Sequence, residues 1–391
     1  MTFRPATTAD LDQILRLWMQ GFNTTRADAE RYRERAKIEQ FRVVEDAGAV
    51  KAIMRWFPFG HFFGGRAVRA AGVASVAVSP DTRGRGIGKE LMVESMKEIR
   101  AAGFPISSLY PATVPLYRSV GYGFAMVRTN WKSTLGALPD VREEGVSLSP
   151  VSSSEVGELN TLYEHIAAGQ NGLVQRSAEW WNDNVLNARD ESTRWAYLVR
   201  EDGDVTGWII YETQSSSGNW RFKLSCRDLF WSTPGAARAL LSMASLHRST
   251  AEEIAWTGAP DEPIQWLTKD HAIEPDGSFH AMVRLMDVPA AFEARGYPAA
   301  VDASFTIRVS DPLFQQNEGP WRVEVSGGSA KVVRVDDARA RCDVQGLASL
   351  WSCALRPRDA VRLGVLDADE ETLSALDVVF AGPTPWIADF Y

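Results

Sequence analysis

A glycine-rich turn with two arginines carries the clearest chemical signal in the sequence. Residues 76–89 read VAVSPDTRGRGIGK, an apolar strand that breaks at a proline and leads into the start of a helix. Glycines let the backbone approach phosphate oxygens, amides at a helix start are free to donate, and the helix dipole and arginines attract negative charge. We therefore predict a pyrophosphate site made by Arg83, Gly84, Arg85, Gly86, Ile87 and Gly88.

Two better-known phosphate motifs do not fit this turn. Lys89 does not occupy the G-K-[ST] position of a Walker A loop. The preceding segment is expected among antiparallel strands instead of opening a βαβ unit, which argues against a dinucleotide-binding fingerprint. A surface turn with solvated arginines is the alternative, and the strand-to-helix context favours phosphate binding over it.

The elements expected around the turn form a mixed α/β unit. Hydrophobic periodicity predicts, in chain order, a helix over residues 8–20, strands over 41–44, 50–56 and 68–78, a helix over 86–102, and strands around 105–110 and 123–131. The first two strands flank Glu-Asp-Ala-Gly, which is typical of a hairpin turn. Gly103 suits the left-handed position that ends a helix.

The rest of the chain predicts two further units. Residues 139–154 are rich in Pro, Gly, Ser and charge and are typical of a linker. A helix, a hairpin, a strand and a helix then repeat the order of the first unit without its sequence. After residue 277 a third α+β unit follows. The chain ends in the apolar and aromatic residues 383–391, which we expect to be docked because free termini are usually polar.

Composition excludes several classes of function. Apolar residues make up 45% and charged residues 24% of the chain, as in ordinary globular proteins, and the formal net charge is -8. This charge gives little support for nucleic-acid binding. The sequence shows neither a signal peptide nor a membrane span, so we expect a cytoplasmic protein without a membrane partner. The three cysteines and five histidines lack metal-site spacing, and we expect no metal.

The motifs together resemble a known family. R-x-x-G-x-G after a central strand resembles the coenzyme A signature of the GNAT superfamily, and LYRSVGYG at 116–123 and LMDVPAAFEARGY at 285–297 resemble the enhanced intracellular survival family. This resemblance spans essentially the whole chain. It implies an α+β fold of two tandem GNAT domains, the second degenerate, followed by a sterol-carrier-like domain, with bounds at 1–140, 141–277 and 278–391. It also implies a homohexamer.

The resemblance implies a donor site and catalytic groups. Backbone groups of Val76, Ala77 and Val78 would hold the pantetheine and thioester of acetyl-CoA. Tyr117 would protonate the departing thiolate, which is chemically reasonable for a tyrosine with a reference pKa of about 10; its alternative is a packed aromatic. The α-carboxylate of Tyr391 would be the base. The alternatives are a tail that only packs on the third domain, or Asp389 as the negative charge.

The acceptor site is implied less specifically. Phe22 would form an aromatic wall, while Thr24 and Ser75 replace an acidic and an aromatic residue of related proteins. Asp28 or Glu30 could restore negative charge, or be solvated surface carboxylates. The expected activity is acetyl transfer to primary amines, such as aminoglycoside-like polyamines or lysine side chains, by direct attack in a ternary complex. The alternative function is a non-catalytic lipid-binding or scaffold protein.

Overall fold

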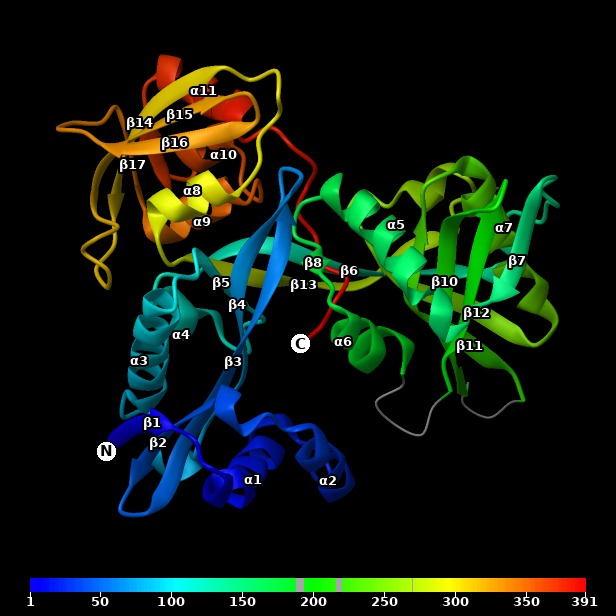
Figure 1. The fold of residues 1–391 in the computed structure, drawn as a ribbon, viewed down its shortest axis with the longest axis horizontal. Coiled ribbons are helices and arrows are strands. Elements are labelled where there is room, and N and C mark those ends of the chain that lie inside the picture. Colours follow the sequence, from blue (N-terminus) through cyan, green and yellow to red (C-terminus); the bar gives the residue numbers. More distant parts are fainter. Residues whose placement is uncertain (188–192, 216–219, 269) are drawn as a thin grey trace.

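A single mixed sheet runs through the first two thirds of the chain. The computed structural model describes residues 1–187, 193–215, 220–268 and 270–391. Within these residues thirteen strands form one sheet, in the order β1-β2-β3-β4-β5-β13-β6-β12-β11-β10-β9-β7, with β8 paired to β3. A separate sheet of five strands belongs to the last part of the chain. Figure 1 shows three lobes, which we call the first, second and third units.

The first unit comprises β1 to β6. Its strands are β1 (Thr2–Pro5), β2 (Phe41–Asp46), β3 (Ala49–Phe63), β4 (Arg66–Val78), β5 (Ile106–Leu109) and β6 (Gly123–Thr134). Its helices are α1 (Leu11–Phe22), α2 (Arg26–Arg35), α3 (Ile87–Ala101) and α4 (Val114–Arg118). Apolar residues of α3 and α4 share one core with β2 to β4, and α1 and α2 cover the opposite face.

The second unit comprises β7 to β13. Its strands are β7 (Val146–Pro150), β8 (Val174–Gln175), β9 (Trp195–Glu201), β10 (Asp204–Ser215), β11 (Phe222–Trp231), β12 (Ala251–Gly258) and β13 (Ile273–Leu285). Its helices are α5 (Val156–Ala168), α6 (Ala178–Trp180), which continues into a π-helical turn (Trp181–Leu186), and α7 (Pro234–Ser245). The last of these strands leaves its own unit.

Strand β13 is inserted into the first unit. It pairs with β5 from Met282↔Leu109 to Leu285↔Ile106, and with β6 on its other edge. Strands β5 and β6 therefore do not pair with each other in the sheet order. The first unit is complete only when the last strand of the second unit is in place.

The third unit follows β13 and has its own sheet, in the order β16-β15-β14-β17-β18. Its elements are α8 (Val288–Ala294), β14 (Ala303–Ser310), β15 (Gly319–Ser326), β16 (Ser329–Arg334), β17 (Ala340–Asp343), α9 (Val344–Trp351), α10 (Pro357–Arg362), β18 (Leu366–Ala368) and α11 (Glu370–Val379). Its core is continuous with side chains of β3, β4 and β5. The long β3–β4 hairpin reaches this unit, where the Gly296 amide donates to the Phe63 carbonyl at 3.0 Å.

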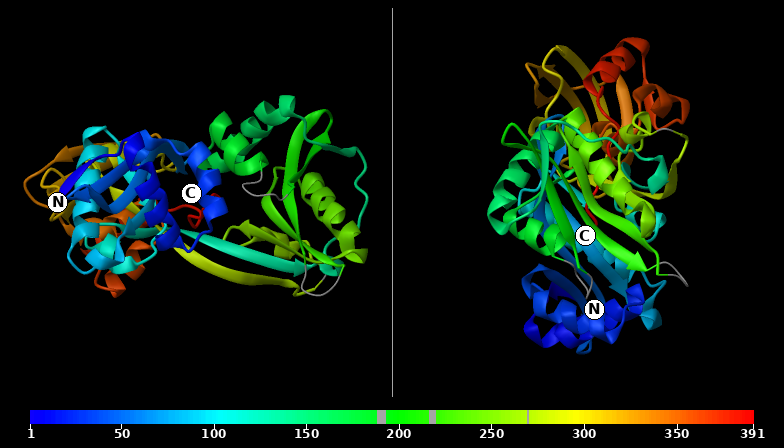
Figure 2. Two further views of the ribbon diagram at one scale, coloured as in Figure 1. Left: turned by 90° about the horizontal axis from the view of Figure 1, so that it is seen from below. Right: turned by 90° about the vertical axis from the view of Figure 1, so that its right-hand side faces the viewer.

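The end of the chain, residues 383–391, returns to the centre of the molecule, and we call this segment the tail. Both views in Figure 2 place the C-terminus among the elements of the first and second units. The tail runs beside β6, because the Val127 amide donates to the Pro385 carbonyl and the Ile387 amide to the Val127 carbonyl, each at 3.1 Å. The expectation that the tail is docked is confirmed.

The expected fold class is confirmed. The first unit has the predicted order of helix, hairpin, strand, helix and two strands. The hairpin turn falls at Ala47 and Gly48, with φ of 49° and 79°. Among the described residues, no helix is long and apolar enough to cross a membrane. No three histidine, cysteine or acidic side chains gather as a metal site would require within that same part of the chain.

Candidate active site

The central feature of the site is a strand that separates from its neighbour. Strand β4 pairs with β5 only from Ala70↔Ile106 to Val73↔Leu109, although β4 continues to Val78. A bulge follows the last pair, where the register with β3 shifts and Ser75 has a φ of 55°. The β4 edge after the bulge is therefore left without a strand partner among the described residues. Unpaired amides and carbonyls there are available to an extended ligand.

The glycine-rich turn lies at the end of this open edge. Gly84 and Gly86 have φ of 77° and 82°, a conformation that glycine adopts without steric cost. Gly86 is the N-cap of α3, and no side chain caps the helix. The first amides of α3 are thus free to donate, and a Cβ atom at either glycine would meet nothing within 4 Å. This open space fits the predicted pyrophosphate site.

A cleft of about 550 Å³ joins the open edge to the turn. It is lined by the predicted residues Val76, Ala77, Val78, Arg83, Gly84, Gly86, Ile87, Gly88 and Tyr117, together with Gly21, Thr82, Lys89, Ala112, Thr113 and Leu116. Arg85 is exposed and is not part of this lining. The structure therefore brings together in one cleft all but one of the residues predicted to bind the donor.

Tyr117 lies on α4 at the inner end of the cleft. Its side chain is 4% exposed, and burial raises the pKa of its hydroxyl to about 12. Desolvation is the cause of this shift, and Tyr117 is one of the residues that line the cleft. Its ring contacts that of Tyr122 at 6.2 Å between centroids, and the Tyr122 hydroxyl lies 2.8 Å from Ser107 on β5. Tyr117 is thus a protonated group that faces the cleft in which the donor is predicted to bind.

Tyr391 approaches β5 from the other face of the sheet. Its hydroxyl lies 2.6 Å from Oγ of Ser108, and successive residues of a strand point to opposite faces. Its ring contacts Phe57 and Phe59 edge-on, with centroid distances of 5.6 and 5.1 Å. Ring contacts with Tyr110 and Trp180 complete its surroundings. The last residue of the chain is therefore fixed beside the point where β4 and β5 separate.

A histidine that sequence reasoning overlooked supports this arrangement. His61 on β3 is fully buried, with Nδ1 2.8 Å from the Gly172 carbonyl and Nε2 2.9 Å from Ser108. Because a carbonyl only accepts, Nδ1 carries the proton, Nε2 accepts from Ser108, and Ser108 accepts from the Tyr391 hydroxyl. Burial lowers the pKa of His61 to about 4, so the ring stays neutral. A lone histidine in the apolar run FPFGHFF was the available signal.

The tail is also anchored by a buried group of charges from the second unit. Asp389 accepts from Arg176 at 3.1 Å, from Arg227 at 2.6 Å and from Trp180 at 3.0 Å. Arg176 also pairs with Asp228 at 2.5 Å. Burial alone would raise the pKa of Asp389, but the charges of Arg176 and Arg227 outweigh it and lower the pKa below its usual value. Asp389 is thus neutralised by its partners and is poorly suited to be a base.

The three residues predicted for the acceptor site make different kinds of contact. Phe22 ends α1, is 42% exposed, and contacts Trp18 at 6.5 Å. Asp28 forms the capping box of α2 with Thr25 and an ion pair with Arg31 at 2.6 Å. Its charge is therefore already compensated. Ser75 stands in the β4 bulge itself.

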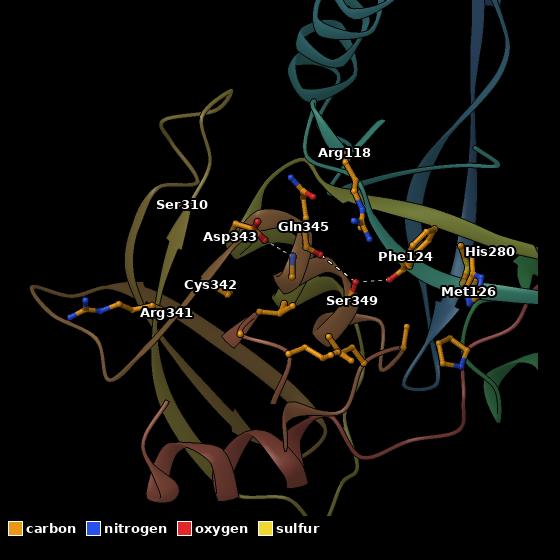
Figure 3. Close-up of a pocket in the computed structure, with 18 of the residues that line it drawn as sticks. Arg118, Phe124, Met126, His280, Ser310, Arg341, Cys342, Asp343, Gln345 and Ser349 are labelled. Atoms are coloured by element: carbon orange, nitrogen blue, oxygen red, sulfur yellow. Dashed lines mark hydrogen bonds between the residues drawn. The ribbon is translucent and has the colours of Figure 1, made fainter. Parts of the chain in front are cut away.

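A second and larger cavity, of about 850 Å³, lies between the first and third units. Figure 3 shows residues of α4, β6, β13 and α9 around it, including Arg118, His280 and Gln345. Ser349 on α9 donates to the Phe124 carbonyl of β6 at 2.7 Å and fixes the third unit against the sheet. This cavity contains neither the glycine-rich turn nor Tyr117, so size does not identify the donor site.

Comparison with known families matches all three units. A model of an acetyltransferase (GNAT) domain matches residues 2–125, and a model of a second acetyltransferase (GNAT) domain matches residues 172–285. A sterol carrier protein domain model matches residues 288–388. The order of these matches is the order of the units in the structure.

Similar proteins carry the same description. An uncharacterized N-acetyltransferase of Streptomyces griseus is 29% identical over 352 residues, covering 84% of this chain and 83% of its own. N-acetyltransferase Eis of Mycobacterium tuberculosis is 25% identical over 342 residues, covering 81% and 79%. The crystal structure of a GCN5-related N-acetyltransferase from Anabaena variabilis matches with a TM-score of 0.94, 28% identity and full coverage of both chains. The chain therefore has two acetyltransferase (GNAT) domains followed by a sterol carrier protein domain and belongs to the GNAT N-acetyltransferases, and over most of its length it is similar to N-acetyltransferase Eis.

Proposed function

We propose that this enzyme transfers an acetyl group from acetyl-CoA to a primary amine by direct attack in a ternary complex. The observation that carries the proposal is the meeting of two groups at the β4–β5 separation. Tyr117 faces the donor cleft from one side of the sheet, and the last residue of the chain is fixed on the other. The two sides would serve the donor and the acceptor.

The donor side supplies binding groups. The free β4 edge at Val76 to Val78 would hold the pantetheine and thioester by backbone hydrogen bonds. The amides of residues 84–88 and the charge of Arg83 would hold the pyrophosphate. The Cβ position of Gly88 lies 3.4 Å from Val78 and 3.7 Å from Leu116, so a larger side chain there would fill the cleft.

The acceptor side supplies the base. Only a neutral amine attacks the thioester, and the α-carboxylate of Tyr391 would take the proton that the amine loses, directly or through a water. A C–N bond forms and the C–S bond breaks, while Tyr117 gives its proton to the thiolate. Ser108 bonds the Tyr391 hydroxyl and Arg176 and Arg227 pair with Asp389, and these contacts would together hold the terminal carboxylate in place.

An extension of the chain tests this proposal. Three residues, Gly-Ser-Gly, added after Tyr391 move the carboxylate away and should abolish acetyl transfer to amines. Acetyl-CoA should still raise the melting temperature, because a ligand at 100 times its dissociation constant stabilises by about 2.7 kcal/mol. The same three residues added before Met1, which is exposed, form the control and should leave transfer intact. Full activity of the carboxyl-terminal extension would refute the role of Tyr391.

The assembly, location and acceptor belong to the same proposal. Aminoglycoside-like polyamines and lysine side chains are the acceptors that the family resemblance implies, and an amine screen by release of the coenzyme A thiol compares them. We also propose a homohexamer in the cytoplasm, without nucleic-acid or membrane partners and without a metal. Sedimentation velocity of the purified enzyme should then give a mass six times that of one chain.

A further inference from the structure

Arg55, for which the described residues provide no acidic partner, lies on the face of the sheet that carries Tyr391, which we call the acceptor face. Arg55 is on β3, opposite Ala74, immediately before the β4 bulge. Its side chain shares a face with Ile53 and Phe57, because alternate strand residues point the same way. Ile53 belongs to the core under α1 and α2, so this face is opposite α3 and the donor turn.

The contacts of Arg55 leave part of its guanidinium unused. One Nη donates to the Tyr32 hydroxyl at 2.8 Å, and the guanidinium carbon lies 4.6 Å from the centre of the Phe57 ring. Its Nε atom is buried without a hydrogen-bond partner. Thr24, between α1 and α2, likewise has a buried hydroxyl without a partner. An unpaired buried donor is costly, and because Arg55 as a whole is half-buried, the rest of its guanidinium remains open to an acceptor.

Arg55 is close to the place of reaction. Phe57, on which Arg55 stacks, contacts the Tyr391 ring edge-on at 5.6 Å. Phe57 and Phe59 also cover Gly72, where a Cβ atom would come within 3.0 and 2.5 Å of their rings. Arg55, Phe57 and Tyr391 therefore follow one another along the acceptor face, next to the bulge of β4.

The carboxylates near this face are already paired with other cations. Asp28 pairs with Arg31, Glu179 with Lys37, and Asp389 with both Arg176 and Arg227. Within the described part of the chain, no ion pair joins Arg55 to a carboxylate. Among the described residues, the acceptor face thus combines a guanidinium without an ion-pair partner with a wall of aromatic rings, and its side-chain carboxylates Asp28, Glu179 and Asp389 are already paired with other cations.

The geometry points to an acceptor that carries an anionic group beside its amine. On the basis of the proposed function, we infer that Arg55 binds a carboxylate of the acceptor while the amine meets Tyr391. A guanidinium and a carboxylate form short, charge-assisted hydrogen bonds, and the rings of Phe57, Tyr32 and Trp18 suit an apolar or aromatic body. The substrate class is therefore an amino-acid-like amine, and Arg55 determines its specificity.

A matched pair of amines tests Arg55. L-phenylalanine and 2-phenylethylamine differ only in the carboxylate, and spermidine represents a polycation. We would measure kcat/KM for each with acetyl-CoA and full-length enzyme. Phenylalanine should exceed 2-phenylethylamine by about 10- to 100-fold, which is the range for hydrogen bonds to charged groups. In Arg55→Gln this ratio should collapse through a higher KM for phenylalanine, and Arg55→Lys should restore part of it.

Arg69→Gln is the matched control. Arg69 is also a strand arginine on a ring, 4.7 Å from the centre of Phe104, but Phe104 belongs to the core on the α3 side. The control should keep the wild-type ratio. The two amines differ in basicity, but this difference is the same for every variant. A change in the kcat/KM ratio of phenylalanine to 2-phenylethylamine between wild type and Arg55→Gln therefore reports the effect of Arg55.

The outcomes separate this inference from the proposed function. A ratio unchanged in Arg55→Gln, or a preference for spermidine or 2-phenylethylamine in the wild type, overturns the role of Arg55 while acetyl transfer stands. Acetyl transfer only to lysine peptides or aminoglycosides would also overturn the role of Arg55 and leave the proposed acetyltransferase activity intact. If acetyl-CoA raises no melting temperature and no amine releases its thiol, both proposals fail together.

Discussion

Tyr117 and Tyr391 reach the middle of the sheet from opposite faces. Tyr117 is linked through Tyr122 to Ser107, and Tyr391 is bonded to the next residue, Ser108. Two adjacent serines on a four-residue strand thus relate the two sides of the site. In the proposed mechanism, this relation would let residues far apart in sequence act on one bond without touching each other.

The role of Tyr117 gives a kinetic prediction. Tyr117→Phe should lower kcat by about 100-fold or more, since general acids contribute at least that much. Acetyl-CoA affinity should change little, because the proposed proton transfer serves the thiolate that forms only during the reaction. Tyr122→Phe is the control: its hydroxyl contacts Ser107 outside the cleft lining, so only stability should fall. Because the pKa of Tyr117 is about 12, its hydroxyl should stay protonated below pH 10, so the wild-type kcat should not fall there through loss of the general acid. Unchanged kcat in Tyr117→Phe would leave the tyrosine a packing residue.

His61 gives a prediction about pH. Its pKa is about 4 in the fold and about 6.5 when unfolded, so between these values the unfolded chain binds the extra proton. Stability should therefore fall as pH drops from 6.5 to 4, by up to about 3 kcal/mol from this residue. Urea unfolding at pH 7 and pH 5 should show a smaller fall for His61→Gln than for wild type. The exposed His271→Gln is the control, and equal falls in all three would contradict the assignment.

At the scale of elements, the two ends of α3 provide a clean comparison. Gly86 before the helix and Gly103 after it have φ of 82° and 76°, and neither has a neighbour within 4 Å of its Cβ position. Alanine at either should cost about 1 kcal/mol of stability through backbone strain. Only Gly86→Ala should also weaken acetyl-CoA binding, measured by calorimetry, since Gly86 lines the cleft. Equal affinity in both variants would show that the turn does not hold the donor.

The first unit shows which elements were predictable. The helix over 86–102, the hairpin at Ala47 and Gly48 and the glycine-rich turn follow from local spacing and turn chemistry. The structure has them as α3, the β2–β3 turn and part of the cleft lining. The partners of the tail could not be predicted. Arg176, Arg227 and Asp389 become one buried group only through tertiary contacts, and each alone is typical of a solvated surface residue.

At the scale of the whole molecule, the insertion of β13 predicts that the first unit cannot fold without the rest of the chain. A fragment of residues 1–140 lacks the strand between β5 and β6 and keeps two unpaired edges. It should show no cooperative thermal transition by circular dichroism and no response to acetyl-CoA, in contrast to the full chain. A fragment that melts cooperatively and binds the donor would show that the first unit stands alone. The insertion of β13 could not be predicted from the sequence, because hydrophobic periodicity indicates where strands lie along the chain and not which strands pair with each other.

The same strand order affects the protein while it is being made. The ribosome releases β6 well before β13, and at about 5–20 residues per second the wait lasts roughly 8 to 30 seconds. Throughout that interval the edges of β5 and β6 have no native partner and are open to other chains. The nascent chain is therefore more prone to aggregation than the folded enzyme. Chaperones that cover strand edges during translation should determine the yield of folded protein in the cell.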